Sequence, residues 1–289
     1  MGVSFLRAPE DFSYRASDAQ LDLAVVAGIK KVAQKENDTV FGDVRAVVVP
    51  HHLVATEALA RGVSVVTRAR PNTVILISPD HFQQCPTYVC TTYGHFTTFF
   101  GTTHVASGLI TQARQSGGYV SLSHGFITEH GVFSIVPYIA HYAPDARIVP
   151  FMLSVRKNET RDDQIRFQKL VGELMSAPDT VLVVSSDFSH YLTLSESDVM
   201  DALTTDTVCS GDIEKIRALL NPQQSDCPQC LATVLSVAQV QGFSHQRFLS
   251  HTNAARLLHD VATKETTSHF VIALGTAEDS VPCGQVRER

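Results

Sequence analysis

Short apolar runs that alternate with helical patterns limit this chain of 289 residues to an α/β fold. The β-branched and apolar runs are typical of buried strands and lie at 44–49, 73–77, 148–153 and 181–184, with later ones at 248–249 and 270–274. Apolar residues recur at helical spacing over 21–32, 53–61, 162–175, 212–220 and 230–241. We expect Gly62 to end the second of these helices. The alternation predicts a central sheet, mostly parallel or mixed, flanked by helices.

The composition predicts one globular domain. No repeat or Pro/Gly/Ser-rich linker divides the chain, so we expect a single domain over 1–277 and a polar C-terminal tail over 278–289. No apolar run approaches the roughly 20 residues of a membrane helix, and a net charge of −6 argues against nucleic-acid binding. With no recognisable signal peptide, we expect a cytoplasmic protein whose six cysteines are reduced thiols.

Histidine follows directly on three of the expected strands. The run 44–49 leads to His51, 73–77 leads to His81, and 181–184 leads to Asp187 and His190. Ligands of open α/β sheets bind beyond the carboxyl ends of the strands, so these side chains share one crevice if the strands are neighbours. Adjacent residues point apart, and we therefore expect His51 rather than His52 to face that crevice. The alternative for Asp187 is to cap a following helix.

Two further segments carry residues suited to metal or acid–base chemistry. Glu129 and His130 are adjacent, and such a pair either orients a metal ligand or begins an exposed helix. Cys227 and Cys230 form a lone C-x-x-C, whereas a zinc ribbon requires a second pair. Pro228 suits a first helical turn, which places Cys227 near a helix N-terminus where a thiolate is favoured. The alternative is a buried structural cysteine.

Five short motifs occur in an order that resembles the Memo family, whose members include the AmmeMemoRadiSam system protein B. The motifs are Pro50-His51, Ser78-Pro-Asp-His81, Thr98-Phe-Phe-Gly101, Glu129-His-Gly-Val-Phe-Ser-Ile-Val-Pro-Tyr138 and Val184-Ser-Ser-Asp-Phe-Ser-His-Tyr191. The family is related in fold to class III extradiol ring-cleavage dioxygenases. This chain departs from the family pattern at His52-Leu53-Val54, which stands where the family has Ala-Gly-Tyr, and at Asp80 and Phe133.

The resemblance implies a set of site residues. His51, His81 and Cys227 would bind the metal, with Cys230 as the alternative thiolate and Asp80 or Asp187 as the alternative carboxylate. Asp187 and His190 would act as the catalytic acid–base pair in the same pocket. Asp80, Glu129 and His130 would surround and orient the ligands.

The resemblance also implies a cofactor and a function. We expect an iron or copper ion, with zinc as a further option, and an oxidative activity on a small-molecule or peptide ligand. One alternative is a non-catalytic module that binds a peptide or protein partner, and another is an extradiol-type non-haem iron dioxygenase. A thiolate is softer than a carboxylate and is itself oxidisable, so a Cys227 ligand predicts a weak or specialised oxidant rather than a broad catechol dioxygenase.

Overall fold

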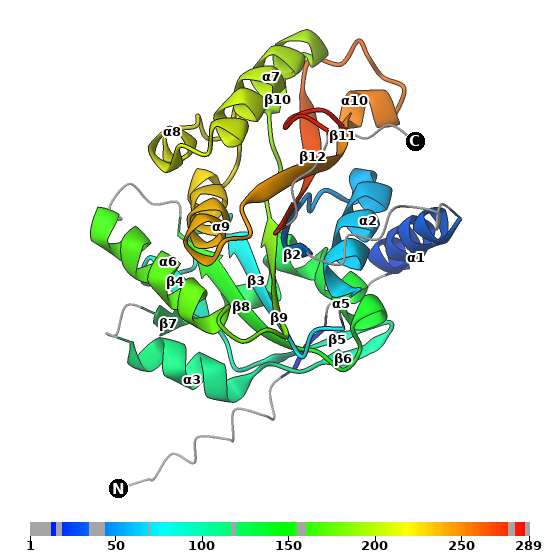
Figure 1. Ribbon diagram of the computed structural model, residues 1–289. Helices are drawn as coiled ribbons and strands as arrows, with labels where there is room; N and C mark the ends of the chain where they lie inside the picture. Colours follow the sequence, from blue (N-terminus) through cyan, green and yellow to red (C-terminus); the bar gives the residue numbers. More distant parts are fainter. Residues whose placement is uncertain are drawn as a thin grey trace, which may run out of the picture.

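A computed structural model describes residues 13–15, 19–34, 44–68, 70–116, 120–154, 160–276 and 281–286. The strands in these residues are β1 (Ser13–Arg15), β2 (Val44–Val49), β3 (Thr73–Pro79), β4 (Val89–Thr91), β5 (His95–Thr98), β6 (Gly101–Thr103), β7 (Val120–Leu122), β8 (Arg147–Leu153), β9 (Thr180–Ser185), β10 (His190–Leu192), β11 (His245–Asn253) and β12 (Thr266–Gly275). Within the described part, nine of them form one sheet in the order β10-β12-β2-β9-β3-β8-β4-β7, with β11 paired to β12. β1, β5 and β6 form a small second sheet (Figure 1).

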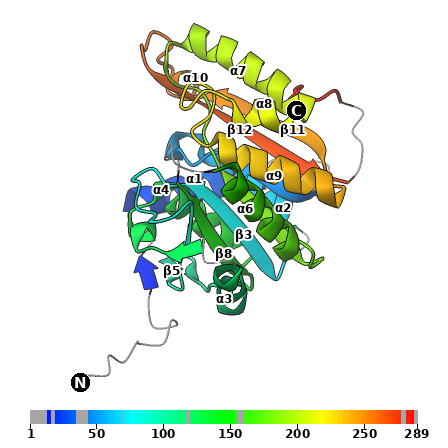
Figure 2. The same ribbon diagram turned by 90° about the vertical axis from the view of Figure 1, so that its left-hand side faces the viewer.

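Helices cover both faces of the large sheet. They are α1 (Ala19–Ala33), η2 (Leu53–Ala55), α2 (Thr56–Thr67), α3 (Ser107–Gln115), η3 (Gly125–Ile127), α4 (His130–Phe133), α5 (Val136–Tyr142), α6 (Arg161–Leu174), α7 (Leu194–Ser210), α8 (Ile213–Arg217), α9 (Pro228–Gln241) and α10 (Ala254–Leu257). α2 packs on one face of the central strands and α9 on the other, with α1 packed against α2 and α6 against α9. α7 and α10 lie against the β11–β12 hairpin at one end of the molecule (Figure 2).

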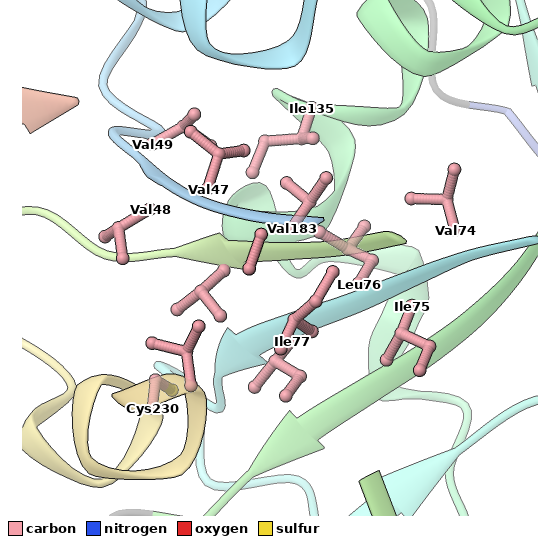
Figure 3. Close-up of a cluster of buried hydrophobic side chains, with 14 of the residues drawn as sticks. Val47, Val48, Val49, Val74, Ile75, Leu76, Ile77, Ile135, Val183 and Cys230 are labelled. Carbon is pink, nitrogen blue, oxygen red and sulfur yellow. The ribbon is translucent and has the colours of Figure 1, made fainter. Parts of the chain in front are cut away.

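The three strands that end in histidine-bearing loops are neighbours. β2 pairs in parallel with β9, and β9 pairs in parallel with β3, so their carboxyl ends lie at one edge. Their apolar side chains, together with those of α9, form a buried cluster in the middle of the molecule (Figure 3). Antiparallel β12 and β4 flank the parallel strands β2, β9, β3 and β8, which makes the sheet mixed, as the sequence predicts.

Gly62 does not end a helix, and that expectation is wrong. The residue lies inside α2, where a Cβ would come within 2.4 Å of Val49 Cγ1 and 3.0 Å of Val271 Cγ1. Glycine at this position lets the helix pack closely on β2 and β12. The local sequence signal of a helix stop therefore reflects a tertiary contact instead.

The cysteines differ from the expected reduced thiols. In the described residues they are paired as Cys85–Cys90, Cys209–Cys283 and Cys227–Cys230. The second pair joins α7 to the C-terminal segment, part of the expected tail over 278–289. Residues 281–286 of that tail are described, and 278–280 and 287–289 lie outside the described residues.

Every helix in the described residues is too short or too polar to span a lipid bilayer.

Candidate metal centre

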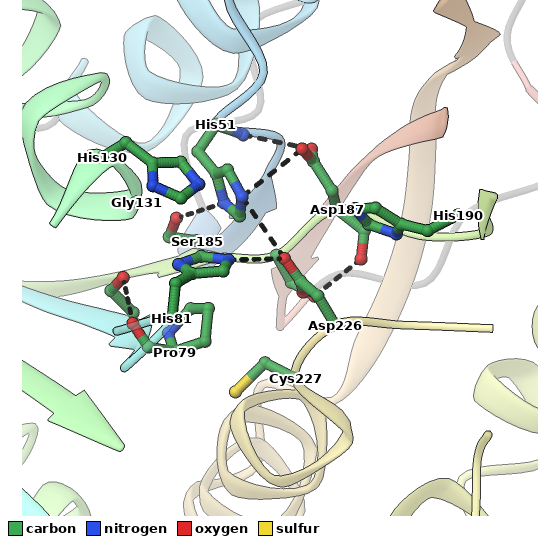
Figure 4. Close-up of polar contacts among 12 residues, drawn as sticks. His51, Pro79, His81, His130, Gly131, Ser185, Asp187, His190, Asp226 and Cys227 are labelled. Atoms are coloured by element: carbon green, nitrogen blue, oxygen red, sulfur yellow. Dashed lines mark hydrogen bonds and ion pairs between the residues drawn. The ribbon is translucent and has the colours of Figure 1, made fainter. Parts of the chain in front are cut away.

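His51 and His81 meet beyond the carboxyl ends of β2 and β3, as the strand-end pattern predicts. Their ring centroids are 4.9 Å apart at nearly right angles (Figure 4). His51 is almost completely buried, and its Nδ1 lies 3.0 Å from Ser185 Oγ at the end of β9. This contact leaves His51 Nε2 turned toward the carboxylates at the centre of the site.

Asp226 brings a carboxylate between these two rings. Its Oδ2 lies 3.3 Å from His51 Nε2 and 3.5 Å from His81 Nε2. Asp226 Oδ1 accepts a hydrogen bond of 2.8 Å from Ser186 Oγ, which fixes the carboxylate plane. Asp226 Oδ2 is buried and has no hydrogen-bond partner in the described residues. The polar atoms that face this oxygen among the described residues are the two imidazole nitrogens.

These three residues fit a divalent transition metal. Two imidazoles and one carboxylate with converging donor atoms are the ligand set of the 2-His-1-carboxylate iron(II) sites. Sequence reasoning missed Asp226, although the residue stands directly before Cys227 and opens the same turn. The spacing of the C-x-x-C drew attention to the cysteines instead.

Cys227 is not placed as a metal ligand, which corrects the expected thiolate. It is the N-cap residue of α9, is fully buried and is disulfide-bonded to Cys230 in the first helical turn. Figure 4 shows its sulfur directed away from Asp226. The same bond occupies Cys230, the alternative ligand. The helix start instead brings a carboxylate to the two histidines, from the residue before the cysteine.

Glu129 holds the His81 ring in position. Glu129 Oε1 accepts a 2.7 Å hydrogen bond from His81 Nδ1, and Oε2 accepts one of 3.0 Å from the His81 backbone N–H. Such a carboxylate–histidine contact leaves Nε2 available for a metal and raises the basicity of the ring. Burial disfavours the His81 imidazolium, but contacts with Asp226 and Glu129 outweigh it and raise the pKa of His81 to about 10.

His130 is the third histidine of this group. One ligand atom from each of His51, His81 and His130 lies within 4.8 Å of the other two. The centroid of the His130 ring lies 4.1 Å from that of His81, with the two rings tilted by 32°, and half of the His130 side chain is exposed. Burial and the two neighbouring imidazoles lower the pKa of His130 to about 4, so it is neutral at neutral pH.

Asp187 is buried beside His51 rather than serving as a helix cap. Its Oδ1 accepts a 3.2 Å hydrogen bond from the His51 backbone N–H, and its Oδ2 lies 3.4 Å from His51 Nε2. Burial disfavours the charged carboxylate, but His51 and His269 outweigh it and hold the pKa of Asp187 well below its usual range. His190 is half-buried, and its Nδ1 donates to the Phe188 carbonyl.

Asp80 supports the loop that carries His81. Its carboxylate oxygens accept hydrogen bonds from the backbone N–H groups of Gln84 at 2.9 Å and Cys85 at 2.7 Å. These bonds use both oxygens, so Asp80 shapes the loop after β3 and does not join the ligand group.

Comparison with known proteins identifies the chain. The family model described as Memo-like protein matches residues 12–266. A MEMO1 family protein of Nitrosopumilus maritimus is 21% identical over 241 residues, which cover 79% of this chain and 83% of the relative. One from Archaeoglobus fulgidus is 28% identical over 116 residues, covering 39% of this chain and 44% of the relative. One from Methanothermobacter thermautotrophicus is 24% identical over 149 residues, covering 49% of this chain and 51% of the relative.

The chain thus spans about half the length of the latter two relatives. A solved structure of an uncharacterized protein from Escherichia coli K12 aligns with a TM-score of 0.49 and 13% identity, covering 80% of this chain and all of that chain. The family model covers most of the sequence, including His51, His81, Asp187 and Asp226. The chain belongs to the Memo family.

Proposed function

We propose that this protein binds iron(II) through His51, His81 and Asp226 and oxidises a small hydroxylated molecule with O₂. The observation that carries the proposal is the buried Asp226 Oδ2, which faces both imidazole Nε2 atoms and has no hydrogen-bond partner in the described residues. A hard carboxylate in place of a thiolate favours iron(II) over copper, which prefers softer ligands. An iron(II) ion with open coordination positions would supply the activation of O₂.

The surrounding side chains suit proton transfer to and from a substrate. Because His190 Nδ1 donates to the Phe188 carbonyl, the lone pair of the neutral ring lies on Nε2 and can accept a proton from a substrate hydroxyl. His130 is neutral at neutral pH and half exposed, so it offers a second proton acceptor. Asp187 is buried and ionised beside His51, and its negative charge favours cations in the site.

Exposed aromatic side chains favour an aromatic substrate. The Phe82 side chain is 53% exposed, and its ring lies 5.9 Å from that of His130. Tyr191 is 69% exposed, and its ring lies 5.7 Å from that of His190. Extradiol opening of a catechol ring places both oxygen atoms of O₂ in the product and needs no added reductant. The expectation of a weak or specialised oxidant depended on a thiolate ligand from Cys227. With a carboxylate from Asp226 in its place, that argument against an extradiol reaction no longer applies.

The test begins with metal binding and continues with oxygen consumption. Protein purified without metal and loaded anaerobically with iron(II) should retain iron through His51, His81 and Asp226. Loss of a residue that only hydrogen-bonds to a metal ligand lowers metal affinity by roughly 10–100-fold. Asp226→Asn removes a ligand itself and should lower iron affinity by more than that. Asp206→Asn, an exposed change on α7, is the matched control and should retain wild-type affinity.

Oxygen uptake with a panel of catechols and protocatechuate-like acids then tests the reaction. Ring-opened product should form with wild-type and Asp206→Asn proteins and be lost in Asp226→Asn. Iron binding without oxygen uptake on any member of the panel would contradict the oxidative activity and favour a ligand-binding role. Equal iron affinity in Asp226→Asn and wild type would contradict the ligand set.

A further inference from the structure

A second group of metal-ligand side chains lies directly behind the first. One ligand atom from each of His52, Asp187 and His269 lies within 4.8 Å of the other two. His269 is fully buried, Asp187 is almost fully buried, and His52 is half-buried. The ring centroids of His52 and His269 are 5.3 Å apart. His51 and His52 are adjacent in sequence, and each belongs to a different group.

The fold holds these three residues together. The loop after β9 is hydrogen-bonded to β12, because Phe188 N–H donates to the Ser268 carbonyl and Ser268 N–H donates to the Ser189 carbonyl, both at 3.0 Å. This pairing sets Asp187 beside His269, whose Nδ1 lies 3.3 Å from Asp187 Oδ1. The site is therefore built on a strand and a tied loop rather than on a free surface segment.

Unsatisfied nitrogen atoms are the first indication of a missing ligand. His269 Nε2 and His52 Nδ1 are buried and have no hydrogen-bond partner in the described residues. Buried polar atoms are satisfied in the large majority of cases, and two orphans in one histidine pair are unusual. A cation bound by His52 Nδ1 would satisfy that nitrogen, whereas His269 Nε2 lies across the ring from the Nδ1 that faces Asp187.

The charge balance is an independent second indication. Three carboxylates are buried around the two groups, from Glu129, Asp187 and Asp226. Among the described residues their ion-pair partners are histidines, with no lysine or arginine. Buried carboxylates need cationic or hydrogen-bonded partners, and divalent ions bound by the imidazoles would supply them.

We propose that His52, Asp187 and His269 bind a second divalent transition-metal ion, adjacent to the ion of the first site. Asp187 faces both sites, since its Oδ2 lies 3.4 Å from His51 Nε2 and its Oδ1 3.3 Å from His269 Nδ1. Two imidazoles and a carboxylate suit zinc, cobalt or iron rather than calcium or magnesium. The second site goes beyond the proposed oxidation and does not depend on it.

Cobalt(II) titration of untagged, metal-free protein tests the proposal. Wild type should bind two equivalents, measured by visible absorption and by metal analysis after gel filtration. His52→Ala and His269→Gln should each bind one equivalent. His259→Gln, an exposed histidine in neither group, is the control and should bind two.

The same titration distinguishes a failure of the first-site proposal from a failure of the second-site proposal. His81→Ala should also bind one equivalent, and the double variant His81→Ala/His52→Ala should bind none. If wild type binds one equivalent that His81→Ala abolishes and His52→Ala retains, the second site is refuted and the first stands. If wild type binds one equivalent that His52→Ala abolishes and His81→Ala retains, the first site is refuted and the second stands.

Anomalous diffraction from cobalt-soaked wild-type crystals keeps the test independent of folding in the variants. Two peaks are expected, one between His51, His81 and Asp226 and one between His52, Asp187 and His269. A cobalt peak at the first group with none at the second would overturn the proposal.

Discussion

Single side chains orient the histidine rings of this site, and Ser185 is a clear case. Its Oγ lies 3.0 Å from His51 Nδ1 and fixes which nitrogen of the ring faces the carboxylates. Ser185→Ala should lower metal affinity about 10-fold, at the lower end of the roughly 10–100-fold effects of outer hydrogen-bond partners. Competition with a chelator of known affinity measures the change.

Ser236→Ala is the matched control for this prediction. Ser236 is a half-buried serine of α9 whose hydroxyl donates to Gln168 Oε1, within the same protein but outside both histidine groups. Its removal should leave metal affinity unchanged. Equal affinity of the Ser185→Ala variant and wild type would show that His51 keeps its orientation without the hydroxyl.

The raised pKa of His81 predicts that the affinity for the metal depends on pH. In the metal-free protein its pKa is raised to about 10, so the ring is protonated at pH 7. A metal binds only the neutral imidazole, and binding at pH 7 therefore releases this proton. Affinity should rise roughly tenfold per pH unit as pH increases toward 10, because fewer rings must lose a proton.

Calorimetry in two buffers with different ionisation enthalpies measures that release directly. The apparent binding enthalpy should differ between the two buffers by about the difference in their ionisation enthalpies, because about one proton is released per metal ion bound. Glu129→Gln removes one contact that raises the His81 pKa, so its affinity should depend less steeply on pH. A binding enthalpy independent of the buffer would contradict protonated His81 in the metal-free state.

At the level of residues, the sequence could indicate only part of the site. The pattern of apolar strands in the sequence is enough to identify the residues that directly follow the strands, which are His51, His81, Asp187 and His190. Asp226 lies before a helix, and a single carboxylate in a polar loop carries no periodic signal. His269 lies inside β12, where alternation marks a core position and nothing in the local sequence indicates a neighbouring Asp187.

Among the elements, close packing at glycine explains why α2 lies where it does. A methyl group at Gly62 would come within 2.4 Å of Val49 Cγ1, and valine side chains are stiff. Gly62→Ala should therefore lower the free energy of unfolding by about 1–3 kcal/mol, the usual cost of overpacking, despite the better helix propensity of alanine. Urea unfolding followed by circular dichroism gives the difference.

Gly172 of α6 provides the opposite case in the same kind of element. A Cβ there would have Gln241 Nε2 at 3.7 Å as its nearest contact, which is ordinary van der Waals distance. Gly172→Ala should raise the free energy of unfolding by about 0.4–1 kcal/mol. If both substitutions lower the free energy of unfolding, the effect of Gly62→Ala cannot be assigned to its close contact with Val49.

Helix α7 is one of the elements that sequence reasoning overlooked, and it shows the limit of hydrophobic periodicity. α7 buries Ser197, Asp201, Thr204 and Val208, a face with helical spacing but mostly polar side chains. Its buried carboxylate accepts hydrogen bonds from Ser189 and Ser268, with Asp201 Oδ1 at 2.9 Å and 2.6 Å from their hydroxyls. A polar network replaces the apolar stripe that a sequence search detects.

Across the whole molecule, the alternation of strands and helices was enough to predict the mixed sheet, but not the order of its strands. The insertion of antiparallel β12 between β10 and β2 depends on pairing between residues more than 200 positions apart, such as Val48 and Ile272. Local patterns contain no information on such pairings. The same insertion brings His269 to Asp187, so the second group of ligands depends on the topology as a whole.

The metal should stabilise the entire domain, since its ligands come from distant parts of the chain. His51, His81 and Asp226 follow β2, β3 and α8 respectively, and they converge only in the folded state. An ion that binds the native state alone adds about 2.7 kcal/mol at a concentration 100 times its dissociation constant. With roughly 2–4 °C per kcal/mol for a large domain, the melting temperature should rise by about 5–10 °C. Calorimetric scans with iron(II) or with a chelator measure the shift, and Asp226→Asn should lose most of it. A melting temperature that is the same with and without metal, in protein shown to bind it, would mean that the unfolded chain binds the ion equally well.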